Sequence, residues 1–160
     1  MPEHIRTHSL KVAQVAELLA RLLAEQGAPV KVELVTAGAM LHDIAKALCL
    51  DGSCDHARVG GDICREHGYS ELAPLVEEHV ILKRGFTGSY GEREIVYYAD
   101  KRVRHDQVVS LEERRDDIIS RYAANDPPRQ EEIYQNFLIC RQVEEHLFSS
   151  LPLKPRELSP

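Results

Sequence analysis

The segment "AGAMLHDIAKAL", residues 37–48, places an imidazole beside a carboxylate within an apolar stretch. His42 and Asp43 are flanked by alanine, leucine, methionine and isoleucine, which are typical of a protein core. A buried carboxylate must be paired, neutralised or bound to a metal ion, because an isolated buried charge is very costly. For this dipeptide alone, a His–Asp hydrogen bond in the core is the commoner arrangement. A metal site requires further ligands.

Further candidate ligands occur elsewhere in the chain. His8 lies in "THSLKV", and Asp100 interrupts the apolar segment "VYYADKRV". His56 opens "HARVGG" and His79 lies in "VEEHVIL"; each is weak alone, because an isolated histidine is more often a surface or satisfied core residue. Mixed imidazole and carboxylate ligands suit Fe, Mn, Co, Ni or Zn, and Mg is possible. The whole set therefore predicts a site for one or two divalent metal ions.

The order of these histidines and aspartates resembles the HD-domain metal-dependent phosphohydrolase superfamily over about the first 105 residues. "LHDIAK" and "YYADK" look like its second and last metal-binding motifs. "HARVGGDICREHG" followed by "LAPLVEEHV" looks like the segment that carries two further histidines in dinuclear members. Within the superfamily the chain is most similar to small bacterial HDIG/YqeK-like proteins, which cleave diadenosine tetraphosphate symmetrically. After Asp100, "ADKRV" and "VVSLEER" look more like other stand-alone HD proteins, or HD domains attached to nucleotidyltransferase-like proteins.

The resemblance implies a dinuclear site in which Asp43 bridges the two ions. The implied ligands are His8, His42, Asp43 and Asp100 for one metal, and Asp43, His56 and His79 for the other. Two such ions polarise a phosphoryl oxygen and generate hydroxide near neutral pH. The expected activity is hydrolysis of a phosphate ester or phosphoanhydride of a nucleotide or related small molecule by a metal-activated hydroxide. Phosphomonoesterase, phosphodiesterase and dinucleoside polyphosphate hydrolase activities all remain open, with Asp43 as a catalytic residue.

Four basic residues are candidates for binding the substrate phosphate. Lys46 lies four residues after His42, on the same face of an expected helix, and is also a catalytic candidate; the alternative is an ion pair with Asp43. Arg104 is four residues after Asp100, and Lys83 and Arg84 border the glycine-rich loop "KRGFTGSYGE". The alternative for these three is an ordinary solvated charge.

Two other classes of function share this ligand order. One is a di-iron HD-type oxygenase, which would consume oxygen without releasing phosphate. The other is a non-catalytic metal- or nucleotide-binding regulatory domain. A fold alone does not choose between these classes, so the site must decide.

The elements that position the ligands are expected to be helices. Apolar residues recur with a helical period, glycines mark helix ends, and no convincing strand is present. The expected helices cover residues 8–27, 29–48, 56–68, 70–82 with Ser70 as N-cap, 93–105, 110–124 with a Ser110–Glu113 capping box, and 130–151. The fold class is therefore an all-α, compact bundle of about seven helices, with a single HD-type domain at 1–150 and a flexible C-terminal tail at 151–160.

Composition narrows the partners. The net charge of −6 disfavours a nucleic-acid partner and favours a small phosphorylated substrate, with the metals supplying the positive field. No segment approaches the roughly 20 apolar residues of a membrane span, and no signal peptide is expected at the N-terminus. The four cysteines, at 49, 54, 64 and 140, form no CxxC pair and are expected to be reduced thiols in a cytoplasmic protein.

The last helix carries an apolar stripe that includes Ile133, Phe137, Cys140 and Val143. Such a stripe is more often core than interface, although it leaves a homodimer possible. No chemistry is expected from residues 110–150.

Overall fold

The computed structural model describes residues 1–50 and 52–160. Over these ranges it has seven α-helices, two 3-10 helices and one pair of two-residue strands, which confirms the all-α bundle. The elements are α1 (Glu3–Glu25), α2 (Val32–Leu41), η1 (Lys46–Leu48), α3 (His56–Glu66), α4 (Ala73–Glu77), α5 (Glu92–Lys101), β1 (Val103–Arg104), β2 (Gln107–Val108), α6 (Leu111–Tyr122), α7 (Pro127–Ser149) and η2 (Pro155–Glu157).

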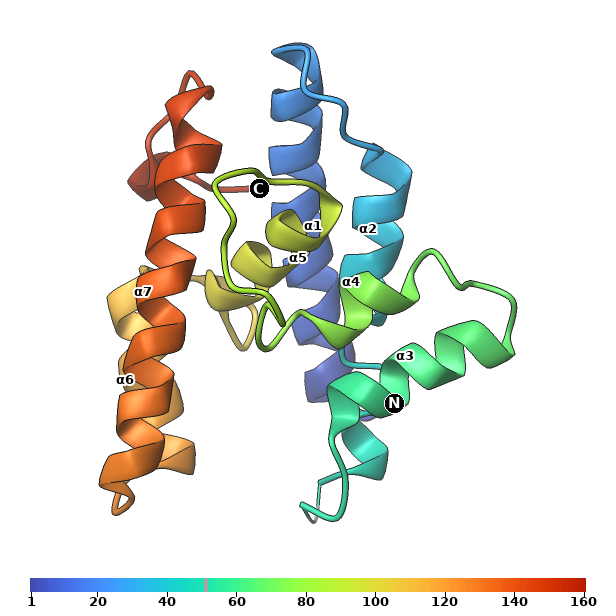
Figure 1. Ribbon diagram of the computed structural model, residues 1–160, viewed down its shortest axis with the longest axis vertical. Coiled ribbons are helices and arrows are strands. Elements are labelled where there is room, and N and C mark those ends of the chain that lie inside the picture. The colour runs from blue at the N-terminus through green and yellow to red at the C-terminus, as the bar shows by residue number, and fades with distance from the viewer. Residues whose placement is uncertain (51) are drawn as a thin grey trace.

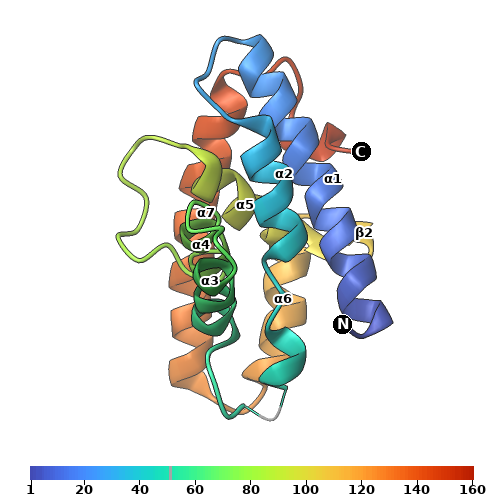
Figure 2. The ribbon, with the colours of Figure 1, turned by 90° about the vertical axis from the view of Figure 1, so that its right-hand side faces the viewer.

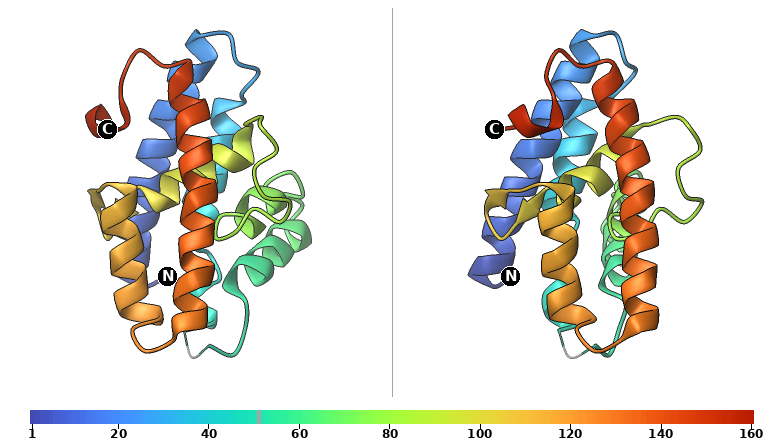
Figure 3. Two further views of the ribbon diagram at one scale, coloured as in Figure 1. Left: turned by 60° about the vertical axis from the view of Figure 1, so that its left-hand side comes forward. Right: turned by 90° about the vertical axis from the view of Figure 1, so that its left-hand side faces the viewer.

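The helices form two pairs with α5 between them. Helices α1 and α2 run antiparallel side by side (Figures 1 and 2), and α6 packs against α7. Helix α5 contacts α1 and α2 on one side and α7 on the other (Figure 3). Helices α3 and α4 pack on each other, and α4 also contacts α2 and α5. This arrangement brings α1, α3, α5 and the segments that follow α2 and α4 close to one another.

The apolar period of α1 explains its position in the core. Val12, Val15, Ala16 and Leu19 are fully buried, and they recur at the three- and four-residue spacing that lines one helix face. Helix α1 ends at Glu25, and Gly27 follows with a positive φ of 87° that a residue with a side chain would adopt only with strain. The chain can therefore reverse and lay α2 along α1.

Two buried tyrosines fix α7 against α5. The Tyr97 hydroxyl donates a hydrogen bond to the Asn136 carbonyl oxygen (2.8 Å), and the Tyr98 hydroxyl donates to a Glu144 carboxylate oxygen (2.6 Å). Both rings are fully buried, so an unpaired hydroxyl at either position would be destabilising. These bonds set the distance between the two helices.

Helices α3 and α4 approach closely because α3 carries glycine at the contact. A Cβ atom added at Gly60 would lie 2.7 Å from Val76 Cγ1, which is closer than real Cβ contacts. Val76 also supplies the carbonyl that accepts a hydrogen bond from His79 Nδ1 (2.6 Å). The α3–α4 contact therefore sets the position of a predicted metal ligand.

Two of the expected helices are about half as long as predicted, or less. The helix over 29–48 ends at Leu41; residues 42–45 form turns with i→i+3 bonds, and η1 follows. The helix over 70–82 shrinks to α4, which starts after Leu72 without a side-chain cap, so the predicted Ser70 cap is wrong. The apolar period continues past both helix ends, where the rings of His42 and His79 bond the carbonyls of Ala39 and Val76, three residues earlier.

The prediction that the chain has no strand is also wrong. Helix α5 ends at Lys101, and β1 pairs antiparallel with β2, with Val103 opposite Val108. The turn between them contains His105, whose φ of 57° lies in the left-handed region. By contrast, the capping box is confirmed, because Ser110 Oγ accepts from the Glu113 amide and the Glu113 carboxylate accepts from the Ser110 amide.

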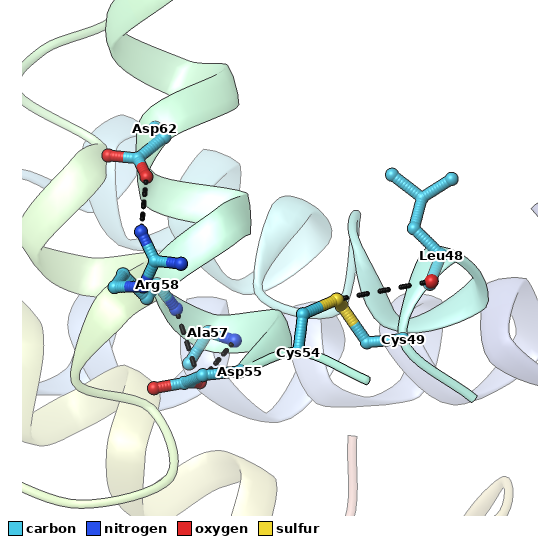
Figure 4. The surroundings of a disulfide bond; sticks show 7 residues. All are labelled: Leu48, Cys49, Cys54, Asp55, Ala57, Arg58 and Asp62. Carbon is cyan, nitrogen blue, oxygen red and sulfur yellow. Dashed lines mark hydrogen bonds and ion pairs between the residues drawn. A yellow bond between two sulfur atoms is a disulfide. The ribbon is translucent and has the colours of Figure 1, made fainter. Parts of the chain in front are cut away.

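Two of the four cysteines are bonded, which corrects the expectation of four reduced thiols. Cys49 and Cys54 form a disulfide, while Cys64 and Cys140 are free and buried. The chain reverses between η1 and α3, so the two Cα atoms come within 5.1 Å, a separation suited to a disulfide. Figure 4 shows the disulfide immediately before Asp55, whose carboxylate caps α3 by accepting from the amides of Ala57 and Arg58. The disulfide thus joins the end of η1 to the start of α3.

The last ten residues make contacts that a free tail would lack. Leu158 is buried in the main core, and the Arg102 guanidinium donates to the Pro155 carbonyl (3.0 Å). The segment 151–160 thus lies against α5 in this structure.

The α3–α4 contact gives a first prediction. We expect Gly60→Ala to lower the free energy of unfolding by roughly 1 kcal/mol. The overpacked Cβ atom costs about 1–3 kcal/mol, which exceeds the gain of about 1 kcal/mol from replacing glycine by alanine in a helix. Chemical denaturation measures the effect. Gly91→Ala is the control, because its Cβ would meet only Glu94 Oε2 at 3.7 Å. Equal loss in both variants would contradict a tight contact at Gly60.

The disulfide gives a second prediction. Replacing both Cys49 and Cys54 by serine should lower the free energy of unfolding by about 2 kcal/mol, because the closed loop is short. A reducing agent should lower the stability of the wild type by a similar amount and leave the double variant unchanged. If the reducing agent affects both proteins equally, the disulfide does not contribute the difference.

Candidate metal centre

The structure brings all six predicted metal ligands to one buried cluster. The ligands come from five parts of the fold: His8 from α1, His42 and Asp43 from the turn after α2, His56 from the first position of α3, His79 from the residues after α4, and Asp100 from α5. Five of the six are buried, and His56 is partly exposed. The cluster therefore exists only when all five elements are packed together.

One half of the cluster is formed by two histidines and two aspartates. His8 Nε2 lies 3.1 Å from Asp100 Oδ1, and His42 Nε2 lies 3.7 Å from the same oxygen. His42 Nε2 is also 3.5 Å from Asp43 Oδ2. Ligand atoms of His8, His42 and Asp43 all lie within 4.8 Å of one another.

The other half uses the second oxygen of Asp43. Asp43 Oδ1 lies 3.4 Å from His56 Nε2 and 3.5 Å from His79 Nε2. The two imidazole nitrogens are 3.3 Å apart. Asp43 thus offers one oxygen to each half of the cluster, which is the arrangement of a carboxylate shared by two ions.

Three of the histidines are oriented from their outer side. The Nδ1 atoms of His8, His42 and His79 lie 3.0, 2.7 and 2.6 Å from the carbonyl oxygens of His105, Ala39 and Val76. A carbonyl oxygen only accepts, so Nδ1 carries the proton and Nε2 of the neutral ring has a lone pair facing the cluster. Backbone carbonyls orient metal-binding histidines in the same way.

The inner atoms lack ordinary hydrogen-bond partners. Among the described residues, His42 Nε2 and Asp43 Oδ1 are fully buried and form no hydrogen bond. Their distances to neighbouring polar atoms, 3.4–3.7 Å, exceed the 2.7–3.2 Å or so of an N–H···O hydrogen bond. Buried polar atoms without partners require an explanation. The lone pairs of the imidazole nitrogens and carboxylate oxygens converge in two groups, and each group suits a divalent cation. The residues present therefore fit the metals that the sequence predicts.

The electrostatics keep both carboxylates ionised. Burial alone would raise the pKa of Asp43, but the neighbouring imidazoles of His42, His56 and His79 hold that pKa well below its usual range. Burial would likewise raise the pKa of Asp100. The Lys101 charge and the hydrogen bond with His8 instead hold that pKa far below its usual range. Burial lowers the pKa of His79 and favours its neutral, ligating form. Carboxylate and neutral imidazole are the forms that bind metal.

Each carboxylate also has its own lysine. Lys46 Nζ lies 2.7 Å from Asp43 Oδ2, and burial would lower the pKa of Lys46 but the Asp43 charge raises it. Lys101 Nζ lies 3.1 Å from Asp100 Oδ2 and donates to the His79 carbonyl oxygen (2.6 Å). The structure thus places Lys46 in an ion pair with Asp43. No pattern in the sequence indicates that the Lys101 side chain would be buried beside Asp100.

A cavity of about 320 Å³ adjoins the cluster. Asp43, Lys46, His56, His79 and Asp100 form one part of its lining. Side chains of α6 and α7 form the opposite part: Arg114, Ile118, Tyr122, Arg129, Glu132, Ile133, Asn136 and Phe137. The expectation that residues 110–150 carry no chemistry overlooked this wall, although the four-residue spacing of its α6 members is visible in the sequence.

The structure does not bring the other predicted phosphate ligands to this cavity. Among the described residues, Lys83, Arg84 and Arg104 are absent from the lining. Lys83 is exposed and pairs with Glu77 (2.8 Å), and Arg104 lies in β1. The glycine-rich loop that follows Arg84 lies to one side of the bundle (Figure 2).

Comparison with known proteins agrees with this geometry. The model of the family described as "HD domain" matches residues 5–124, more than half of the chain. The chain belongs to the HD-domain superfamily. Membership places the chain in a superfamily of metal-dependent hydrolases, and the His/Asp cluster is consistent with a divalent-metal site.

Curated relatives share only part of their length with this HD protein. It is 38% identical over 79 residues to the uncharacterized protein MJ0778 of Methanocaldococcus jannaschii, covering 49% of this chain and 46% of the relative. It is 41% identical over 66 residues to ribonuclease Y of Fusobacterium nucleatum, covering 41% of this chain and 12% of that enzyme. Ribonuclease Y of Thermosipho melanesiensis is 36% identical over 78 residues, covering 48% and 14%. No solved structure matches significantly.

Within residues 1–50 and 52–160, no helix has the length and apolar character needed to cross a bilayer.

Shared use of Asp43 gives a prediction for metal content. Asp43→Asn should lower affinity for both ions at least about 100-fold, since changes even outside the ligand set cost 10–100-fold. His56→Gln should remove one ion and leave the other. Elemental analysis after dialysis against Mn²⁺ measures the stoichiometry.

The matched control for the metal measurement is His67→Gln, because His67 is an exposed histidine on the far end of α3. Wild-type metal content in Asp43→Asn would contradict a metal site at this cluster.

Proposed function

We propose that the protein is a metal-dependent phosphohydrolase that cleaves a phosphate ester or phosphoanhydride of a nucleotide or related small molecule. The observation that supports this most is the shared carboxylate of Asp43, whose two oxygens face separate histidine groups at the edge of a cavity. One or two divalent ions bound there supply positive charge for a phosphoryl oxygen and acidify water. The other steps depend on the chain itself.

The cluster residues keep the site preorganised. The carbonyls of Ala39 and Val76 hold the rings of His42 and His79, so these two rings need not turn to bind a metal ion. Lys46 holds Asp43 through one oxygen and leaves the other free. A preorganised polar site stabilises developing charge without a reorganisation cost during the reaction.

The cavity supports a small substrate. Its volume of about 320 Å³ lies at the lower end of the roughly 300–1,000 Å³ of ligand pockets. Its apolar side chains, including Ile118, Ile133 and Phe137, suit an organic group attached to phosphate. The names of the ribonuclease Y relatives describe an action on RNA, so a short RNA belongs among the substrates to be tested.

Phosphate release tests the proposal. The panel contains nucleoside mono- and triphosphates, diadenosine tetraphosphate, p-nitrophenyl phosphate and a short single-stranded RNA, each with Mn²⁺, Fe²⁺, Co²⁺, Ni²⁺ or Mg²⁺. We expect metal-dependent hydrolysis of at least one small phosphate compound. Asp43→Asn should lower the rate at least about 100-fold, because charge stabilisation in the transition state is lost.

Two outcomes would contradict the proposal. Hydrolysis that persists in Asp43→Asn would mean that another site or a contaminant is responsible. Absence of hydrolysis with every metal, together with oxygen uptake by the iron-loaded protein, would indicate the oxygenase class instead.

A further inference from the structure

Helix α6 presents one stripe of side chains to the cavity. Arg114, Ile118 and Tyr122 are four residues apart, so they lie on one face of the helix, and all three line the cavity. Arg114 is at the end near the cluster, with Nη2 3.9 Å from Asp100 Oδ1. Tyr122 is 64% exposed and lies at the solvent end. The wall therefore changes from cationic beside the cluster to apolar and aromatic toward solvent.

The guanidinium of Arg114 has unused hydrogen-bond donors. Its side chain is only 12% exposed, and Nη1 donates to Asp117 Oδ2 (3.0 Å), which lies one turn later on α6. Arg114 Nε is buried and has no hydrogen-bond partner among the described residues. Its Nη2 is too far from Asp100 for a hydrogen bond. Since arginine has five N–H groups, a donor face remains for a ligand.

The other cations of the lining are engaged by protein groups. Lys46 is bound to Asp43, and Lys101 to Asp100 and the His79 carbonyl. Arg129 is exposed and pairs with Glu132 (2.8 Å). Arg114 is therefore the cation of the described lining that is largely enclosed and whose Nη2 is left without a hydrogen bond.

Helix α7 completes the wall. Ile133 and Phe137 are one turn apart on α7, both are buried, and both line the cavity with Ile118. These side chains provide an apolar surface within the same cavity as the Arg114 guanidinium. A phosphate near Arg114 would then place an attached organic group against this surface.

We propose that Arg114 binds the substrate phosphate and that Ile118 and Phe137 bind the organic group attached to it. The substrate class is thus an organic phosphate with one ring-sized apolar or aromatic group next to the phosphate. This inference rests on the proposed function, which supplies the phosphate substrate. Arginine suits the role because its planar fork binds two phosphate oxygens at once.

Phenylphosphonate and methylphosphonate test the proposal, because their C–P bonds are not hydrolysed as phosphate esters are. Calorimetric titration into the Mn²⁺-loaded protein gives Kd for each. Arg114→Gln should raise both Kd values by roughly 10- to 100-fold, the range for hydrogen bonds to charged groups. Its metal content should match the wild type. Arg115→Gln is the matched control, since Arg115 neighbours Arg114 on α6, pairs with Asp116 and does not line the cavity.

A second variant tests the apolar surface separately. Ile118→Ala should weaken phenylphosphonate binding by about threefold to tenfold, because apolar contact area is lost. It should leave methylphosphonate binding unchanged, since that probe does not reach the surface. Equal effects on the two probes would overturn the placement of the organic group.

Three results would overturn the role of Arg114. These are no binding of either phosphonate by the wild type, unchanged Kd values in Arg114→Gln, and a rise in Kd accompanied by loss of metal, which would mean that Arg114 acts only through Asp100. If Arg114→Gln does not fold, Arg114→Lys keeps the charge but loses the fork. A rise in Kd of threefold or more is then expected, and an unchanged Kd overturns the proposal.

Binding and hydrolysis separate the two proposals. Arg114-dependent phosphonate binding without hydrolysis of any compound would support the binding role and contradict the phosphohydrolase. Metal-dependent hydrolysis, together with a phosphonate Kd that Arg114→Gln leaves unchanged, would support the phosphohydrolase and contradict the binding role of Arg114.

Discussion

The buried carboxylate of Asp43 constrains the whole fold. Its side chain is 1% exposed, and of its two oxygens only one has a hydrogen-bond partner, Lys46. A charge in that position is tolerated only when partners surround it, and those partners come from the turn after α2, η1, α3 and the segment after α4. Folding of the bundle and assembly of the cluster are therefore one event. Because unfolded chains rarely retain such a site, the free energy of metal binding adds to the free energy of unfolding.

Helix α5 connects this cluster to the rest of the molecule through three consecutive charged residues. Asp100 contacts His8 of α1, and Lys101 reaches the backbone of His79 while its ammonium lies 4.6 Å from the centre of the Tyr97 ring. Arg102 donates to the carbonyls of Val109 and Pro155 and contacts the Tyr98 hydroxyl. All three side chains are buried, and each is compensated by fixed partners rather than by water. The β1–β2 hairpin and the C-terminal segment are thereby held to the same helix that supplies Asp100.

Local patterns predicted the elements whose ends are determined locally. The Gly27 turn and the Ser110–Glu113 capping box depend on neighbouring residues, and both are present. The ends of α2 and α4 were missed because the apolar period continues beyond them to His42 and His79, whose rings lie in a cluster assembled by tertiary packing. The six ligands were found because their chemical types are unusual in apolar segments. Arg114 was missed because "LEERRDD" reads as a solvated charge run, and only tertiary packing distinguishes Arg114 from Arg115. The Cys49–Cys54 pair was missed because its separation of 5 residues is not a CxxC spacing and cysteines of a cytoplasmic protein are expected to be reduced.

The family match includes one side of the cavity completely and the other side only in part. The family match covers residues 5–124 and so includes every cluster residue and all of α6, but α7 begins at Pro127. Ile133, Asn136 and Phe137 of α7 nevertheless line the cavity, and Asn136 is fixed there by bonds to the Tyr97 hydroxyl and the Val80 carbonyl. The chemistry of the cluster therefore belongs to the shared domain, whereas part of the surface opposite it comes from a helix outside the match. We infer that the metal-dependent chemistry is set by α1–α5, and that the shape of the cavity opposite the cluster depends on how α7 is held against α5.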